Sequence, residues 1–226
     1  MPLLPVHSDQ MIQRIAAPYL NWGVILVCVS AYIAMFELSP YARAEALHRF
    51  GFIAGAFFGS APQPALPFGL PSSATLVTYA FLHGSNAHLI GNMVVLFVFA
   101  SVVEDRFGHW GFAALYIGSA IVAALAEGLW APTTTNVLIG ASGAVAGVLG
   151  AYIVLFPRAK IAILLPIFIS VAVRAWFVIG AWLLYDIVML YYGEGSVAWL
   201  AHLAGFAVGV GAAAALRAIA PEVSHS

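Results

Sequence analysis

The sequence predicts an all-α polytopic membrane protein, a compact bundle of six transmembrane helices with a long membrane-associated loop between the first two. Two observations carry this prediction. Of the 226 residues, 63% are hydrophobic and only 8% are charged, and the mean hydropathy is +1.00. Soluble domains carry about 25% charged residues, so this chain must face lipid over most of its area. The apolar residues also gather in six segments, most of them near the roughly 20 residues that cross a bilayer.

The six segments are residues 19–36, 87–103, 110–130, 139–156, 171–192 and 197–216. Trp and Tyr lie near several of their ends, as membrane interfaces favour. The fourth segment is short, which is acceptable where protein or water satisfies the first backbone groups of a helix. We therefore expect a short cytoplasmic N-terminal segment (1–18), a six-helix domain (19–217) and a short C-terminal tail (218–226).

The connection between the first two segments, residues 37–86, is unusually long. Its prolines interrupt any long helix: Pro40, Pro62, Pro64, Pro67 and Pro71. The apolar stretch 50–58 is too short to span, so a partly helical loop in the membrane interface fits better. Since most connections are short, a long loop of this kind indicates a function.

Basic residues predict the orientation. With the N-terminus in the cytoplasm, the segments on that side carry Arg14, Arg106, Arg158, Lys160 and Arg217. The opposite side keeps only Arg43 and Arg49, and Arg174 lies at the fifth segment and counts for neither. Because positive charges favour the cytoplasmic side, we expect both termini in the cytoplasm.

Charge and cysteine content exclude several classes of protein. The net charge is −1 and no basic run is present, which argues against a nucleic-acid partner. Cys28 is the only cysteine, so an internal disulfide and a thiolate metal cluster are excluded. We expect a buried, unreactive thiol there.

Four polar residues stand out, because a charged side chain at mid-span costs about 2.5–3.5 kcal/mol and polar groups there need a reason. They are His88 and Asn92 in the second segment, Ser142 at the start of the fourth and His202 in the sixth. His88 and Asn92 are four residues apart, so they share one helix face. Taken alone, that pair fits a polar contact between helices.

Glycines indicate how the fourth and sixth segments pack. Small residues recur every three or four positions in both: Gly140, Gly143, Gly147 and Gly150 in one, Gly205 and Gly209 in the other. Faces of this kind let two helices approach backbone to backbone. A serine in such a helix is common and by itself weak evidence. Close packing would bring Ser142 and His202 within hydrogen-bond reach, about 2.6–3.2 Å.

These residues together predict acyl-transfer chemistry. A serine hydroxyl needs a base to take its proton, and a neutral imidazole suits that role. His88, Asn92 and the Ser142 backbone N–H could donate to an oxyanion. We found no carboxylate obviously placed for a triad. A supporting role of Asp186, deep in the fifth segment, towards His202 is conceivable, but we do not assign Asp186 to the site. We expect Glu127 to be a solvated interfacial carboxylate.

Three stretches resemble rhomboid intramembrane proteases. Residues 81–93 (FLHGSNAHLIGNM) with 104–108 (EDRFG), residues 140–143 (GASG) and residues 201–209 (AHLAGFAVG) match the family's motifs in order and on the expected segments. Together these motifs are specific, although each alone is not. The similarity covers roughly residues 76–217.

The resemblance implies a Ser142–His202 dyad with no acidic member and an oxyanion site shared by His88, Asn92 and the Ser142 backbone. It also implies single-span transmembrane protein substrates, contact with membrane lipids, and neither a metal nor an organic cofactor. His83 matches a family histidine with a structural role. We expect a bacterial plasma membrane protein and make no prediction of its oligomeric state.

Two departures from the family pattern affect the base and the loop. Many members carry an aromatic residue one turn after the nucleophile, where this chain has Ala146. Some carry Trp-Arg in the first loop, where this chain has Ala74-Thr75. Two alternatives stay open: a catalytically silent rhomboid relative that binds membrane clients, and a small transporter. We found no similarity between the two halves of the chain, which disfavours a transporter.

Overall fold

The computed structural model describes residues 4–62, 67, 71–164, 170–192 and 197–220. Pro64 of the predicted loop and residues 221–226 of the predicted tail lie outside the described residues. The helices are α1 (Tyr19–Phe36), α2 (Pro40–Phe50), α3 (Ala54–Phe57), α4 (Thr75–Thr78), α5 (Asn86–Val95), α6 (Ser101–Trp130), α7 (Ser142–Leu155), α8 (Ala175–Tyr192) and α9 (Trp199–Ile219). Shorter turns are Ser72–Ala74, Tyr79–Phe81 and the π-helical Leu96–Ala100, and the strands are β1 (Leu4–Ser8), β2 (Lys160–Leu164) and β3 (Ser170–Arg174).

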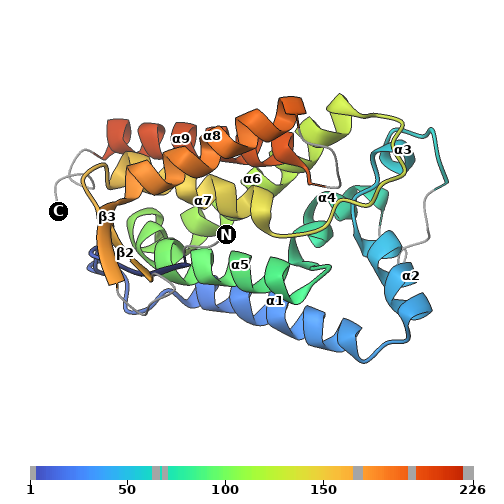
Figure 1. The fold of residues 1–226 in the computed structure, drawn as a ribbon, viewed down its shortest axis with the longest axis horizontal. Helices are drawn as coiled ribbons and strands as arrows, with labels where there is room; N and C mark the ends of the chain where they lie inside the picture. Colours follow the sequence, from blue (N-terminus) through green and yellow to red (C-terminus); the bar gives the residue numbers. More distant parts are fainter. Residues whose placement is uncertain (1–3, 63–66, 68–70, 165–169, 193–196, 221–226) are drawn as a thin grey trace.

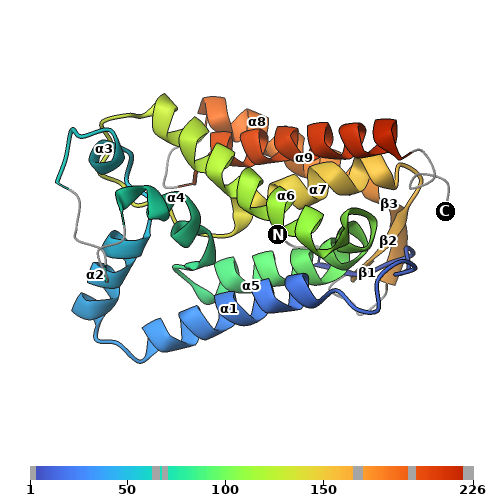
Figure 2. The same ribbon diagram turned by 180° about the vertical axis from the view of Figure 1, so that it is seen from behind.

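Helix α7 lies at the centre of the bundle. Figure 1 shows α1 and α5 along one edge, α8 and α9 along the other, and α7 between them. Figure 2, the view from the opposite side, shows α6 crossing in front of α7. Eleven of the 14 residues of α7 are buried. The predicted fourth segment can therefore be short, because protein rather than lipid surrounds it.

The predicted second and third segments form one helical stretch that bends at Gly108. This glycine has φ 69° and ψ 168°, a left-handed region in which other residues are strained. Within the described residues, four helical stretches are long and apolar enough to cross a membrane: Tyr19–Phe36, Asn86–Trp130, Ala175–Tyr192 and Trp199–Ile219. The chain is thus a helical, multi-pass integral membrane protein, and the count of six spans stays a prediction.

Helices α7 and α9 touch through their backbones. A Cβ on Gly205 would overlap the carbonyl group of Gly143, and a Cβ on Gly209 would overlap that of Gly147. Any side chain at these positions would push the helices apart. Gly140 does not belong to this face. It lies in the loop before α7, so the prediction that it packs in the helix interface was wrong.

A small antiparallel sheet, in the order β1-β2-β3, closes one end of the bundle. The prediction of a helix over 171–192 was wrong for its first four residues, which belong to β3. Val171 and Val173 pair with Ile163 and Ile161 of β2, because β-branched residues pack well across a sheet. Strand β1 pairs with β2 as well, so the N-terminal segment is built into the same body as the helices.

The long loop between α1 and α5 is partly helical, as predicted, where it is described. Its apolar stretch is less exposed than an interfacial loop would be. Phe52 is 1% exposed, Ile53 and Ala54 are buried, and the Phe52 ring lies against Gly128 of α6. Residues 52–54 of this loop therefore pack on the bundle as part of its core, while α2 has no buried residue.

Two buried carboxylates hold the N-terminal part of the chain. Asp105 Oδ1 accepts the backbone N–H groups of residues 13–15 at 2.6–3.0 Å. Glu104 accepts those of residues 20 and 21 at 3.1 and 2.8 Å. The first N–H groups of a helix lack partners within it. Glu104 therefore caps α1 rather than facing solvent at the end of its own segment.

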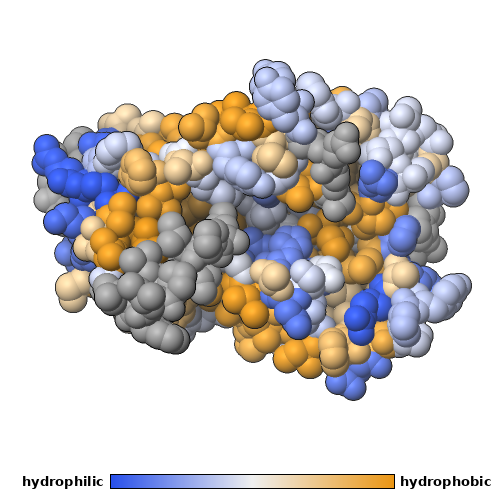
Figure 3. All heavy atoms as spheres, in the orientation of Figure 1, coloured by the Kyte–Doolittle hydropathy of each residue, from blue (hydrophilic) through white to orange (hydrophobic). Residues whose placement is uncertain are grey.

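Most basic residues that we assigned to the cytoplasm lie at the sheet end of the molecule. Three cations donate to oxygens there: Arg106 to Gln13, Arg174 to the Arg158 carbonyl and Arg217 to the Val154 carbonyl. Figure 3 shows hydrophilic residues gathered at this end, on the left, and hydrophobic residues along the flanks. The segments predicted to share one membrane side thus share one end of the bundle.

Substituting Gly209→Ala is expected to lower stability by about 1–3 kcal/mol, because the added methyl group meets backbone that cannot move aside. Thermal unfolding in detergent, followed by the helical circular dichroism signal, measures this. Gly211→Ala is the matched control on the same helix, since a Cβ there meets no atom within 4 Å. Its midpoint should stay the same or rise, because alanine is the better helix former. Equal losses in both variants would contradict the packing described.

Substituting Asp105→Ala is expected to release residues 13–15, because hydrogen bonds to a buried carboxylate contribute about 1.5–3 kcal/mol each. The measurement is the rate of limited trypsin cleavage after Arg14, which should rise at least about tenfold. Cleavage after Arg49, in the exposed Arg49–Glu45 pair of α2, should not change and serves as the control. An unchanged rate after Arg14 would show that other contacts hold the segment.

Candidate active site

Ser142 and His202 come together at one end of the α7–α9 contact. Ser142 is the first residue of α7, and His202 lies in the first turn of α9. The Ser142 Oγ lies 2.9 Å from His202 Nε2. His202 is 8% exposed, and Ser142 is half-buried. The two residues that the sequence singled out for nucleophile and base therefore form a hydrogen bond across 60 positions of sequence.

A carboxylate lies on the far side of the His202 ring. Asp186 of α8 has no exposed surface, and its Oδ2 is 3.0 Å from His202 Nδ1. The sequence made a contact between Asp186 and His202 conceivable but did not assign Asp186 to the site; the structure contains that contact. The signal was present, because an acid in the middle of an apolar segment is expensive and calls for a partner.

Two indole rings flank His202. The Trp182 ring of α8 lies 5.5 Å from the imidazole, centroid to centroid, and the Trp199 ring of α9 lies at 6.2 Å, nearly perpendicular. Ala146, where many rhomboids carry an aromatic residue, is completely buried. The ring contacts to His202 therefore come from α8 and α9 instead of from α7.

The loop before Ser142 is shaped by Gly140 and His88. Gly140 has φ 117°, which other residues rarely adopt. A Cβ on Gly140 would also collide with the His88 imidazole. The His88 ring therefore lies directly against the backbone two residues before Ser142, which brings this expected oxyanion donor to the nucleophile loop.

Asn92 is buried, and its side chain contacts His83. Its Nδ2 donates to His83 Nε2 at 3.1 Å, and the His83 and His88 rings are 5.1 Å apart. Burial, and next the nearby His88, lower the pKa of His83 from 6.5 to about 4. His83 is therefore neutral near pH 7, and its Nε2 can accept the Asn92 amide.

The long loop and the nucleophile loop support each other through backbone hydrogen bonds. Phe52 and Leu138 exchange both of theirs, at 2.8 and 3.0 Å, and the Gly55 N–H donates to the Thr134 carbonyl at 2.8 Å. The Tyr79 carbonyl accepts the Gly140 N–H at 3.0 Å. These contacts position the chain that leads into Ser142.

Glu127 of α6 reaches the start of α9. Its Oε2 lies 3.3 Å from the backbone N of Ala201, the residue before His202, and it is half-buried. The expectation of a merely solvated carboxylate was wrong. A negative charge at a helix N-terminus is favourable, so Glu127 stabilises the helix that carries the base.

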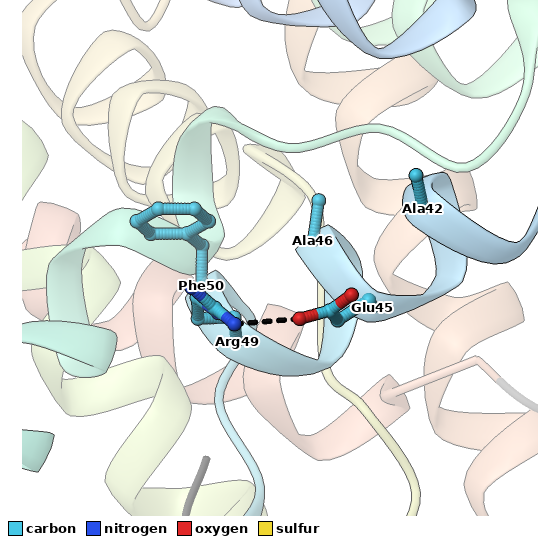
Figure 4. A pocket seen from close by; sticks show the side chains of 5 residues that line it. All are labelled: Ala42, Glu45, Ala46, Arg49 and Phe50. Atoms are coloured by element: carbon cyan, nitrogen blue, oxygen red, sulfur yellow. Dashed lines mark hydrogen bonds and ion pairs between the residues drawn. The ribbon is translucent and has the colours of Figure 1, made fainter. Parts of the chain in front are cut away.

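Other parts of the described chain offer no competing site. Among the described residues, no group of three or more His, Cys, Asp or Glu side chains could hold a metal ion. A hollow of about 170 Å³ lies on α2, where Figure 4 shows the Arg49–Glu45 ion pair. None of the residues that we expected in the site lines it.

Comparisons with known proteins bear on the family. A model described as the Rhomboid domain matches residues 72–219. The chain is 36% identical over 144 residues to "Rhomboid protein 1, mitochondrial" of Saccharomyces cerevisiae, covering 62% of this chain and 40% of the yeast protein. It is 31% identical over 147 residues to "Presenilin-associated rhomboid-like protein A, mitochondrial" of Danio rerio, covering 62% and 38%.

A further relative is "RHOMBOID-like protein 5" of Arabidopsis thaliana, with 37% identity over 76 residues, covering 34% of this chain and 25% of the plant protein. The chain spans less than half the length of each of these three relatives. The family model, in contrast, covers well over half of this chain and includes His88, Asn92, Ser142, Asp186 and His202. The chain therefore belongs to the rhomboid family.

Proposed function

We propose that this protein is an intramembrane serine endopeptidase in which Ser142 is the nucleophile and His202 the general base. The single observation that carries the proposal is the hydrogen bond between Ser142 Oγ and His202 Nε2 at 2.9 Å. This distance lies within the range expected of a nucleophile and its base. Membership of the rhomboid family agrees with it.

The reaction follows from this pair. Ser142 Oγ attacks the substrate carbonyl carbon, its proton passes to His202 Nε2, and the carbonyl π electrons move onto oxygen. When the tetrahedral intermediate collapses, the C–N bond breaks and Nε2 returns the proton to the leaving amine. Water then hydrolyses the acyl-serine by the same two proton transfers, which releases the second product.

His88, Asn92 and the Ser142 backbone N–H are the proposed donors to the oxyanion. Ser142 begins α7, where backbone N–H groups have no partner within the helix. The His88 ring borders the same loop at Gly140. One Asn92 amide hydrogen points to His83, which leaves the second for the oxyanion. Each such donor contributes roughly 2.7–4 kcal/mol to the rate.

The proposed substrates are single-span transmembrane proteins, because the pair lies inside an integral membrane protein among helices that face lipid. Membrane lipids are the proposed surroundings of α1 and α8, whose large apolar side chains are exposed. We propose a bacterial plasma membrane location with the N- and C-termini in the cytoplasm. The mitochondrial names of two relatives make cell fractionation the direct test of this location.

The first test is labelling of the detergent-purified protein with a fluorescent fluorophosphonate, which reacts with activated serines. The wild type should label, Ser142→Ala should not, and His202→Ala should label about 10²–10⁴-fold more slowly, because it lacks the general base. Ser170→Ala and His48→Ala are matched controls at exposed positions and should label like the wild type.

Folding of each variant is checked by its helical circular dichroism spectrum. A folded wild type that does not label would overturn the proposal and favour a catalytically silent client-binding protein. Labelling that survives in Ser142→Ala would place the reactive serine elsewhere.

The buried His83 predicts a pH dependence of stability. Its pKa is about 4 in the folded protein against 6.5 as the ordinary value. Between these values the unfolded chain binds a proton that the folded protein does not, so stability is full above about pH 6.5 and falls as the pH drops towards 4. Thermal unfolding of the wild type and of His83→Gln, compared across this range, measures the effect. The variant should show the shallower fall, and parallel curves would contradict a neutral, buried His83.

A further inference from the structure

Helix α8 carries two side chains that contact the proposed base, although it carries neither Ser142 nor His202. Asp186 Oδ2 is 3.0 Å from His202 Nδ1. The Trp182 ring is 5.5 Å from the imidazole and inclined to it by 37°. Residues four apart lie on one helix face. One face of α8 therefore contacts His202 twice: Asp186 meets the edge of the imidazole, and Trp182 meets its ring plane.

The burial of Asp186 contrasts with the rest of its helix. Of the residues of α8, only Ala175, Ile179 and Asp186 are buried. A carboxylate in apolar surroundings is costly unless it is paired and hydrogen-bonded. Among the described residues, the Asp186 side chain bonds to His202, and its second oxygen, Oδ1, has no protein partner. His202 is therefore the one hydrogen-bond partner of this carboxylate among the described residues.

We propose that α8 supplies the positioning residues of the catalytic centre: Asp186 holds His202 through Nδ1, and Trp182 holds the plane of the ring. This inference rests on the proposed function. The sequence predicted a pair, Ser142 and His202. With Asp186 the proposed centre has three residues, which lie on α7, α9 and α8 respectively.

The contact with Asp186 sets the tautomer of the base. A carboxylate accepts, so the His202 proton stays on Nδ1 and leaves the Nε2 lone pair facing Ser142. When Nε2 takes the Ser142 proton, the carboxylate faces the imidazolium and stabilises its charge, and it does not itself become protonated. When the amine leaves, Nε2 gives up that proton and the neutral Nδ1–H tautomer returns.

Trp182 accounts for the missing ring on α7. Ala146 is buried but offers only a methyl group one turn after Ser142. The indole of Trp182 packs on the imidazole from α8, and Trp199 meets it edge-on. The ring of the base is thus held between two indoles.

The test compares Asp186→Asn with Asp105→Asn, the same chemical change at another buried carboxylate outside the site. The rate of fluorophosphonate labelling should fall about 10²–10⁴-fold in Asp186→Asn, because an amide can donate to Nδ1 and shift the proton to Nε2. Asp105→Asn should label at the wild-type rate per folded molecule. A wild-type rate in Asp186→Asn would overturn the inference.

The ¹⁵N spectrum of histidine-labelled protein reports the tautomer of His202, which a loss of packing alone would not change. The His202 signals are identified by their absence in His202→Ala. In the wild type they should report the Nδ1–H tautomer, and in Asp186→Asn a larger share of Nε2–H. The same tautomer in both proteins would assign Asp186 to a purely structural tie between α8 and α9.

Trp182→Ala tests the second contact, with Trp176→Ala as the matched control on the same helix, since Trp176 is 56% exposed. Trp182→Ala should slow labelling at least about tenfold while Trp176→Ala does not, because only the first loosens the His202 ring. Equal rates would remove Trp182 from the inference. A wild type that does not label would instead defeat the proposed function, while the tautomer measurement would still decide the role of Asp186.

Discussion

The contact between α7 and α9 is the constraint on which the rest of the structure depends. Gly143 and Gly147 face Gly205 and Gly209 so closely that no Cβ fits between the two backbones. Lipid tails are as apolar as leucine, so helices in a membrane associate through such close packing rather than through burial from water. At this separation the first turns of both helices face each other, and Ser142 meets His202 without any further adjustment of the backbone.

Around this contact, four acidic side chains, three of them buried and one half-buried, join parts of the bundle. Asp105 and Glu104 hold the N-terminal segment and the start of α1, Glu127 holds the start of α9, and Asp186 joins α8 to His202. Three of the four accept backbone N–H groups that have no partner within a helix. Asp186 differs because its hydrogen-bond partner is the imidazole that also contacts Ser142. That difference is the physical reason to assign it to the chemistry instead of to the scaffold.

The sequence singled out Ser142 and His202, the proposed nucleophile and base, because a histidine is expensive in an apolar segment and both residues lie in segments whose glycines allow close packing. It did not place Asp186, since nothing in the spacing of α8 shows which of its faces meets the bundle. It also left Ala146 without an explanation. Trp182 of α8 supplies the ring that Ala146 lacks. Trp182 precedes His202 by 20 positions in the sequence, so their contact could not be predicted before the packing of α8 was known.

The sequence by itself determined the membrane character, the helical class, the family motifs and the identity of Ser142 and His202, because hydropathy and motif spacing are local properties. Only the tertiary structure decided three features. Residues 171–174 form a strand of the small sheet instead of the start of a helix, Gly140 lies in a loop against His88, and Asp186 contacts His202. Each of these depends on which residues distant in sequence become neighbours, and in a bundle this apolar most helix faces look alike until they are packed.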